Sequence, residues 1–159
     1  MNNLKDTITE RKQVEQALEN RLRFERLLSD LSARFVNIPP GRVDSEIAYG
    51  LRQILEFFQV DRVALVRALP DRPTYQITHC VYGKDVPAVP VGVELPRSLY
   101  PWAFEKLVEK HEVVSFSRLD DLPPDANVDR QTYAEWGIRS ALDIPITTGG
   151  SVVPGLTTR

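Results

Sequence analysis

The segment DTITERKQVEQALENRLRFERLLSDLSARF, residues 6–35, predicts one long helix near the start of the chain. No glycine or proline occurs between Glu10 and Pro39, and most of the segment consists of good helix formers such as leucine, glutamate, arginine and alanine. Thr7 and Glu10 have the spacing of a capping box, in which a hydroxyl and a carboxylate each bond a free backbone N–H. The rest of the chain is expected to pack on this helix or to be steered by it.

The apolar positions change in character along this helix. Val14, Leu18 and Leu22 form a thin seam among charged residues. The second half carries a wider stripe, with the spacing of a helix face buried in a core: Phe24, Leu27, Leu28, Leu31 and Phe35. We therefore interpret residues 1–23 as a linker or signalling helix that needs a partner, and residues 24–159 as a folded domain.

Composition narrows the class of protein. The chain has 159 residues, 42% hydrophobic and 26% charged, which is ordinary for one soluble domain with a real core. A net charge of −2 gives no general attraction to nucleic acid or to an anionic membrane. The sequence has neither a signal peptide nor an apolar run near 18 residues. A single cysteine, Cys80, excludes an internal disulfide, and we expect a cytoplasmic location.

The order of the remaining elements predicts the fold class. A second amphipathic helix is expected from Asp44 or Ser45 to Phe58. Strands are expected over 62–69, 75–82, 113–116, 140–147 and from 151 onward, and helices over 102–110 and 129–136. Residues 85–96 are expected to be a loop with one short extended piece. The pattern predicts an α+β fold, with an antiparallel sheet of about five to six strands flanked by helices.

Four segments carry a resemblance to a known family: FERLLSDLSARFVNIPP (24–40), LRQILEFFQVDRVAL (51–65), PWAFEKLVEKHEVVSFS (101–117) and WGIRSALDIPITTGGSVV (136–153). With them the chain resembles a GAF domain, the small-molecule sensor module of bacterial signalling proteins. The last segment is the most specific, because GAF domains commonly place a Gly-Ile/Val-Arg/Lys-Ser strand, a proline and a glycine turn at this point. ITERKQVEQAL (8–18) is similar to the segment that leaves a PAS domain in multi-domain sensors such as histidine kinases.

The resemblance implies a six-stranded, profilin-like antiparallel sheet whose last strand is followed by a C-terminal helix. This chain stops at Arg159, inside that final strand. We therefore expect the last strand and the C-terminal helix to be missing, as in a fragment. The hypothesis that follows is an incomplete sheet edge that pairs with a second copy.

Six residues are expected at a ligand pocket, since one face of a GAF-like sheet lines such a pocket: Tyr75, His79, Trp102, Tyr133, Trp136 and Asp143. Alternation places His79 on the same strand face as Tyr75, and Asp143 interrupts an apolar strand. Each has a structural alternative. The aromatic residues would also serve as core, His79 as a hydrogen-bonded structural histidine, and Asp143 as a residue facing solvent or paired with Arg139.

Cys80 is interpreted as a small packed residue, with a redox sensor as the alternative. Neighbours in a strand point to opposite faces, so Cys80 and His79 do not form a catalytic dyad by themselves. One cysteine is too few for the cycle of the GAF-related methionine sulfoxide reductases. No metal site is expected, because no second histidine, cysteine or acidic residue stands at metal spacing from His79.

The resemblance implies a non-enzymatic sensor in a bacterial signal-transduction protein, such as a two-component system, that binds an unknown small molecule and relays its state through the terminal helices. No cofactor is required by the sequence. A homodimer is expected through Val14, Leu18 and Leu22, forming a short coiled coil, without nucleic-acid or membrane contact. Two alternatives stay open: a ligand-free dimerisation module, and a redox or haem sensor that uses Cys80 and His79.

Overall fold

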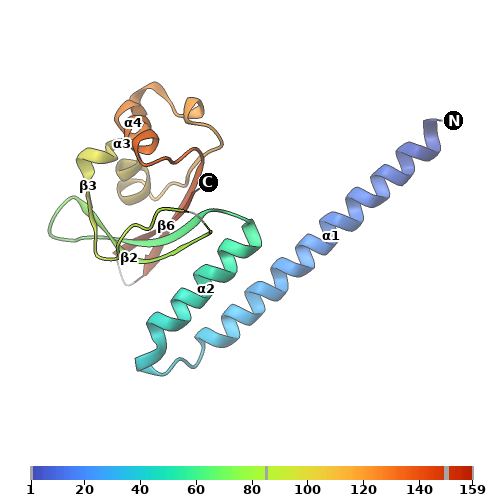
Figure 1. Ribbon diagram of the computed structural model, residues 1–159, viewed down its shortest axis with the longest axis horizontal. Coiled ribbons are helices and arrows are strands. Elements are labelled where there is room, and N and C mark those ends of the chain that lie inside the picture. The colour runs from blue at the N-terminus through green and yellow to red at the C-terminus, as the bar shows by residue number, and fades with distance from the viewer. Residues whose placement is uncertain (1, 85, 149–150, 159) are drawn as a thin grey trace. The chain divides into compact units, whose positions relative to one another are not determined.

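The computed structural model describes residues 2–84, 86–148 and 151–158, with side chains over 7–84 and 86–146 (Figure 1). Its main elements are α1 (Asn2–Phe35), α2 (Val43–Phe58), β1 (Arg62–Ala68), β2 (Thr74–Tyr82), β3 (Glu94–Pro96), α3 (Pro101–Phe104), β4 (Val114–Phe116), α4 (Asn127–Glu135), β5 (Ala141–Thr148) and β6 (Ser151–Thr158). The chain divides into two compact units, Met1–Glu46 and Ile47–Arg159.

The first unit contains the predicted long helix. α1 is continuous but begins at Asn2, so Thr7 and Glu10 lie inside the helix and the capping box does not start it. The reason is that no helix breaker precedes Thr7. The seam residues Val14, Leu18 and Leu22 are 67%, 56% and 45% exposed.

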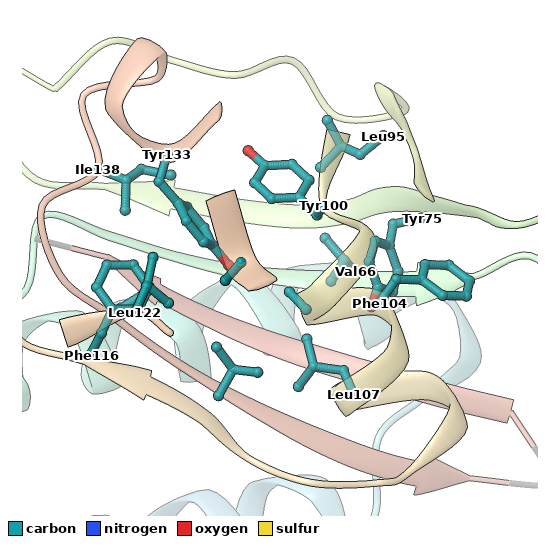
Figure 2. Packing of buried hydrophobic residues seen from close by; sticks show 14 of the residues in the cluster. Val66, Tyr75, Leu95, Tyr100, Phe104, Leu107, Phe116, Leu122, Tyr133 and Ile138 are labelled. Carbon is teal, nitrogen blue, oxygen red and sulfur yellow. The ribbon is translucent and has the colours of Figure 1, made fainter. Parts of the chain in front are cut away.

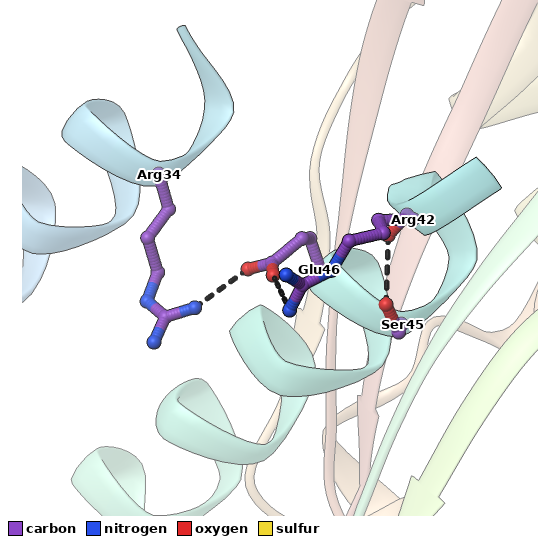
Figure 3. A network of polar contacts seen from close by, with 4 residues as sticks. All are labelled: Arg34, Arg42, Ser45 and Glu46. Carbon is purple, nitrogen blue, oxygen red and sulfur yellow. Dashed lines mark hydrogen bonds and ion pairs between the residues drawn. The ribbon is translucent and has the colours of Figure 1, made fainter. Parts of the chain in front are cut away.

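A buried carboxylate joins the two helices of this unit across the turn at Pro40–Arg42 (Figure 3). Glu46 Oε2 accepts a hydrogen bond from Arg34 at 2.7 Å, and Oε1 accepts one from Arg42 at 3.3 Å. Only 9% of Glu46 is exposed, so these charge-assisted bonds compensate its burial. Ser45 Oγ donates to the Arg42 carbonyl at 2.8 Å and helps to start α2.

Over the described residues of the second unit, six strands form one antiparallel sheet in the order β3-β2-β1-β6-β5-β4. This confirms the predicted α+β class. The expected incomplete edge is wrong, because β6 lies at the centre of the sheet and pairs with β5 along its length and with β1 over Gly155–Thr158. The edges among the described residues are β3 and β4.

Two prolines face each other where the central strands lose their outer neighbours. Pro145 of β5 pairs with Pro154 of β6. The β1 pairing stops next to Pro154, at Leu65↔Gly155, and the β4 pairing stops at Val114↔Asp143. Each proline, which has no N–H to donate, therefore lies where no outer strand needs one.

A β-bulge in β2 changes which residues share a face. Leu65 pairs with His79 and Val66 pairs with Ile77, so Thr78 is an extra residue without a partner on β1. Its hydroxyl donates to the Leu65 carbonyl at 3.1 Å. Since an extra residue reverses the alternation of side chains, the residues after Thr78 point to the opposite face from the one that simple alternation predicts.

Helices cover both faces of the sheet in the second unit. The α2 residues Leu51 and Leu55 pack against Val63 and Val81 on one face. The larger core cluster lies on the other face, under α3 and α4 (Figure 1). The helix expected over 102–110 is α-helical only to Phe104 and continues as a π-helical turn over Glu105–Glu109.

One carboxylate ties α4 to the start of α3. Asp129 is fully buried, and its Oδ1 and Oδ2 accept hydrogen bonds from the backbone N–H groups of Ala103 and Trp102, at 2.8 and 3.1 Å. Thr132 of the same helix donates to the Leu99 carbonyl at 2.7 Å. Because the first N–H groups of a helix have no partner within it, Asp129 supplies the cap that the local sequence of α3 lacks.

We expect the Asp129→Ala variant to lose about 2–3 kcal/mol of unfolding free energy, since it leaves one buried and one partly buried backbone donor without acceptors. Urea denaturation followed by circular dichroism measures the loss. Asp125→Ala is the matched control, because Asp125 is exposed on the preceding turn. Equal stability of the two variants would contradict the capping role.

Candidate functional site

A cavity of about 50 Å³ lies between the sheet and the helices α3 and α4. Most of its wall is apolar, with side chains that include Ala64, Val66, Ile77, Leu95, Leu107 and Ile138. At roughly 10–15 Å³ for each water molecule, the cavity has room for a few waters or a compact ligand.

The structure places four of the six predicted pocket residues on this wall: Tyr75, Tyr133, Trp136 and Asp143. Trp102 is half-buried and packs against the core without lining the cavity, and Lys106 Nζ lies 6.0 Å from its ring. His79 does not line the cavity either, because the bulge at Thr78 turns it away and brings Cys80 to the wall. Ligand contact by any of them stays a prediction.

Asp143 does not face solvent, since it is 0% exposed. Its Oδ2 accepts a hydrogen bond from the Tyr133 hydroxyl at 3.4 Å, while Oδ1 has no partner among the described residues. Within those residues no ion pair joins it to Arg139. Burial raises the pKa of Asp143 well above its ordinary value, because a charged carboxylate is costly to remove from water.

Three tyrosines, Tyr75, Tyr100 and Tyr133, line the same cavity as Asp143, and Figure 2 shows their side chains within the buried cluster. The rings of Tyr100 and Tyr133 lie 5.0 Å apart between centroids, and Tyr75 lies 4.9 Å from Phe104. Burial, and then the charge of Asp143, raises the pKa of all three phenols. The Tyr75 hydroxyl is buried and has no hydrogen-bond partner in the described part of the chain.

Arg62 was not predicted as a site residue, although it lines the cavity from β1. It is 7% exposed, and one terminal nitrogen donates to the Pro87 carbonyl at 3.4 Å. Its Nε is buried without a partner among the described residues. One sequence signal for Arg62 is the alternation that places it on the same strand face as Ala64 and Val66. A small alanine next to a charged residue leaves open space on that face.

The three buried side-chain atoms without a partner in the described residues are Arg62 Nε, Tyr75 Oη and Asp143 Oδ1. All three residues belong to the wall of the same cavity. Buried polar groups are normally paired, because an unpaired one costs free energy. The concentration of unpaired polar atoms at one cavity therefore distinguishes it from an ordinary packing defect.

The segment after β2 is fastened over this cavity. The Tyr82 hydroxyl donates to the Val89 carbonyl and accepts a hydrogen bond from the Val89 N–H at 2.8 Å. Val89 itself lines the cavity. Farther along, the Gly92 N–H donates to the Ile77 carbonyl at 2.8 Å. Val89 thus brings the segment after β2 to the cavity wall.

Cys80 also lines the cavity, and burial raises the pKa of its thiol. The raised pKa lowers the fraction of reactive thiolate, which favours the packed-residue interpretation. No group of three or more metal-ligating side chains occurs in the residues that the structure describes. The helices among those residues include none with the length and apolarity to cross a membrane.

The buried carboxyl group predicts a specific pH dependence. In the unfolded chain Asp143 titrates near 3.8, and in the folded chain well above. Between these two pKa values the unfolded state has already released the proton, so the free energy of unfolding falls as pH rises, by up to about 1.4 kcal/mol per pH unit. Urea denaturation at pH 5 and pH 7 should show this fall in the wild type.

The Asp143→Asn variant should lose less stability than the wild type over that interval, because it has no carboxyl group to titrate. The control Asp120→Asn alters an exposed carboxylate and should follow the wild type. Parallel pH profiles for Asp143→Asn and the wild type would show that Asp143 is ionised in the folded state.

No protein-family model matches the sequence, and no curated protein does. Solved structures do match. The chain superimposes on the phycocyanobilin-bound GAF domain from a cyanobacterial phytochrome with a TM-score of 0.67 and 19% identity, covering 84% of this chain and 78% of that one.

Two further structures come from other signalling proteins. Residues 122 to 287 of a methyl-accepting chemotaxis protein match with a TM-score of 0.56 and 20% identity, over 86% of this chain and 80% of that one. The GAF domain of a two-component sensor histidine kinase from Bacillus halodurans matches with a TM-score of 0.51 and 20% identity, over 72% and 74%. The chain therefore has the GAF fold, as its sequence predicted.

Proposed function

We propose that this chain is a regulatory sensor domain of a bacterial signal-transduction protein and that its cavity binds a small molecule. The observation that carries the proposal is the composition of the cavity wall: in an otherwise apolar lining, three residues each have a buried side-chain polar atom without a partner in the described part of the chain. An apolar enclosure with a few convergent polar groups is the usual form of a small-molecule site.

The comparisons support a sensory role through the fold alone. GAF domains of a phytochrome and a histidine kinase, and a segment of a chemotaxis protein, share it. The phytochrome domain holds phycocyanobilin. That chromophore is much larger than a cavity of about 50 Å³, so we propose a smaller ligand here. We also propose that the domain itself catalyses no reaction.

The mechanism that fits this geometry is a shift between conformations. The cavity wall combines sheet residues such as Tyr75 and Asp143 with helix residues such as Ala103 and Tyr133. A ligand that contacts both layers favours the packing in which all its contacts form, and it shifts the equilibrium by its difference in affinity for the two states. The terminal helices would carry that difference to an output domain in the cytoplasm.

Native mass spectrometry of freshly purified protein tests ligand binding. We expect a mass excess over the denatured protein that disappears on denaturation and gives the ligand mass. Two negative results together would favour the alternative of a ligand-free dimerisation module: no excess mass, and no rise in melting temperature when pools of metabolites are added. A Soret band would instead support the haem alternative at His79.

We further propose that two copies associate through the seam on α1. Val14, Leu18 and Leu22 are exposed apolar residues at helical spacing among charged neighbours, and such a seam is buried when two helices pair. The short coiled coil would connect the sensor to the rest of a multi-domain regulator.

Replacing both Leu18 and Leu22 with aspartate should convert a dimer to a monomer in sedimentation velocity, with the circular dichroism of the domain retained. The variant Gln16→Asp with Asn20→Asp adds the same charge beside the seam and should remain dimeric. A wild type that is monomeric at every concentration, or a dimer that survives the leucine changes, would contradict the proposal.

A further inference from the structure

Arg62 is a buried cation without an anionic partner among the residues that the structure describes. It is 7% exposed, and none of the ion pairs in the described part of the chain includes it. In the ion pairs of the described residues, the arginine or lysine side chain is itself at least partly exposed to solvent. An example is Arg97, which pairs with Glu109 at 2.6 Å. Burying a charge is costly unless an opposite charge and hydrogen bonds compensate it.

The protein satisfies only part of this guanidinium. One long hydrogen bond reaches the Pro87 carbonyl at 3.4 Å, and the Tyr82 ring lies 5.9 Å away. The Nε atom is buried without a partner among the described residues, and the residue lines the cavity. A guanidinium group presents donors in a fixed planar fork that matches a carboxylate.

The acidic residue on the cavity wall does not neutralise Arg62. On the sheet, Arg62 is level with Ala141, and Asp143 is level with Ala64, with β6 between the two strands. With strands about 4.8 Å apart and residues about 3.3 Å apart along a strand, the two Cα atoms are separated by about 12 Å. No ion pair among the described residues joins Arg62 to Asp143, and each keeps a buried side-chain atom without a partner there. The positive charge at the Arg62 end of the wall is therefore not cancelled by Asp143.

Size and charge select the class of ligand. One cation in a mostly apolar wall compensates one negative charge, whereas a phosphate dianion would bring a second charge without a counter-ion. The other atoms without a partner in the described residues, Tyr75 Oη and Asp143 Oδ1, add no second positive charge to the wall. A cavity of about 50 Å³ restricts the apolar body to a few atoms.

We propose that Arg62 determines ligand specificity, and that the cavity takes a compact monocarboxylate with an apolar body, whose carboxylate accepts hydrogen bonds from Arg62. This inference rests on the proposed sensor function and names the chemical class of its ligand.

The test compares isobutyrate with isobutyramide, which has nearly the same shape without the charge. Saturation-transfer NMR gives both dissociation constants on the intact chain, with three proteins: wild type, Arg62→Gln and Arg67→Gln. Arg67 lies on the same strand but is exposed, with one bond to Gln76, so it controls for loss of a positive charge. We expect the wild type and Arg67→Gln to bind the acid at least about tenfold more tightly than the amide, and Arg62→Gln to lose this preference.

Three outcomes would each overturn the inference. The wild type could bind the acid and the amide with equal affinity, or it could bind neither probe at millimolar concentration and about 50-fold excess over the protein. The preference for the acid could also survive in Arg62→Gln. The wild-type comparison decides the matter even where Arg62→Gln does not fold. Native mass spectrometry distinguishes a failure of the ligand class from a failure of the sensor proposal. A bound neutral ligand would refute the carboxylate class and leave the sensor proposal standing. A protein that binds neither the probes nor any other small molecule would refute both.

Discussion

The attachment of α4 to α3 by Asp129 is the constraint on which the cavity depends. A single carboxylate accepts two backbone N–H bonds at the start of α3, and α3 then carries Ala103 to the cavity wall, while α4 carries Tyr133. Without this connection, a helix of four α-helical residues would have little to hold it in place over the sheet. Polar bonds between α4 and the start of α3 thus hold together the two helices that contribute to the cavity wall.

The polar groups inside the cavity act in the opposite direction. Asp143, Tyr75 and Arg62 would each be better paired or replaced by apolar residues if stability alone mattered. Asp143 shares one long bond with Tyr133, and Arg62 makes one with Pro87. A protein that keeps three such groups around one space accepts a lower stability, which is the usual relation between stability and binding function.

Much of the fold could be predicted because the strongest sequence signals are local. Helix periodicity identified α1 and α2, and the β-branched runs identified β1 and β2. Four of the six candidate pocket residues also reach the cavity wall, Asp143 among them. Local pattern could not show that β6 enters the centre of the sheet, because that position depends on pairing with β1 from far earlier in the chain.

The bulge explains the remaining errors at the site. A single unpaired residue, Thr78, exchanges the faces of His79 and Cys80, and nothing in the alternation of YQITHCVY announces it. Arg62 was overlooked for a different reason. A charge at the first position of a strand is ordinarily a solvated end, so the alternation of Arg62, Ala64 and Val66 is a weak signal. The three-dimensional neighbours of Arg62 are needed to show that it is buried.

The central position of β6 has a consequence for how the protein acquires its structure. Arg62 of β1 pairs with Thr158 of β6, so β1 and β5 remain without their shared neighbour until residues near position 158 have been synthesised. Sheets that depend on such distant pairings fold slowly, because the entropy of closing a long loop is lost before the contacts form. During translation the hairpin of β1 and β2 would expose an unpaired strand edge, and this interval is when the nascent chain most needs protection from aggregation.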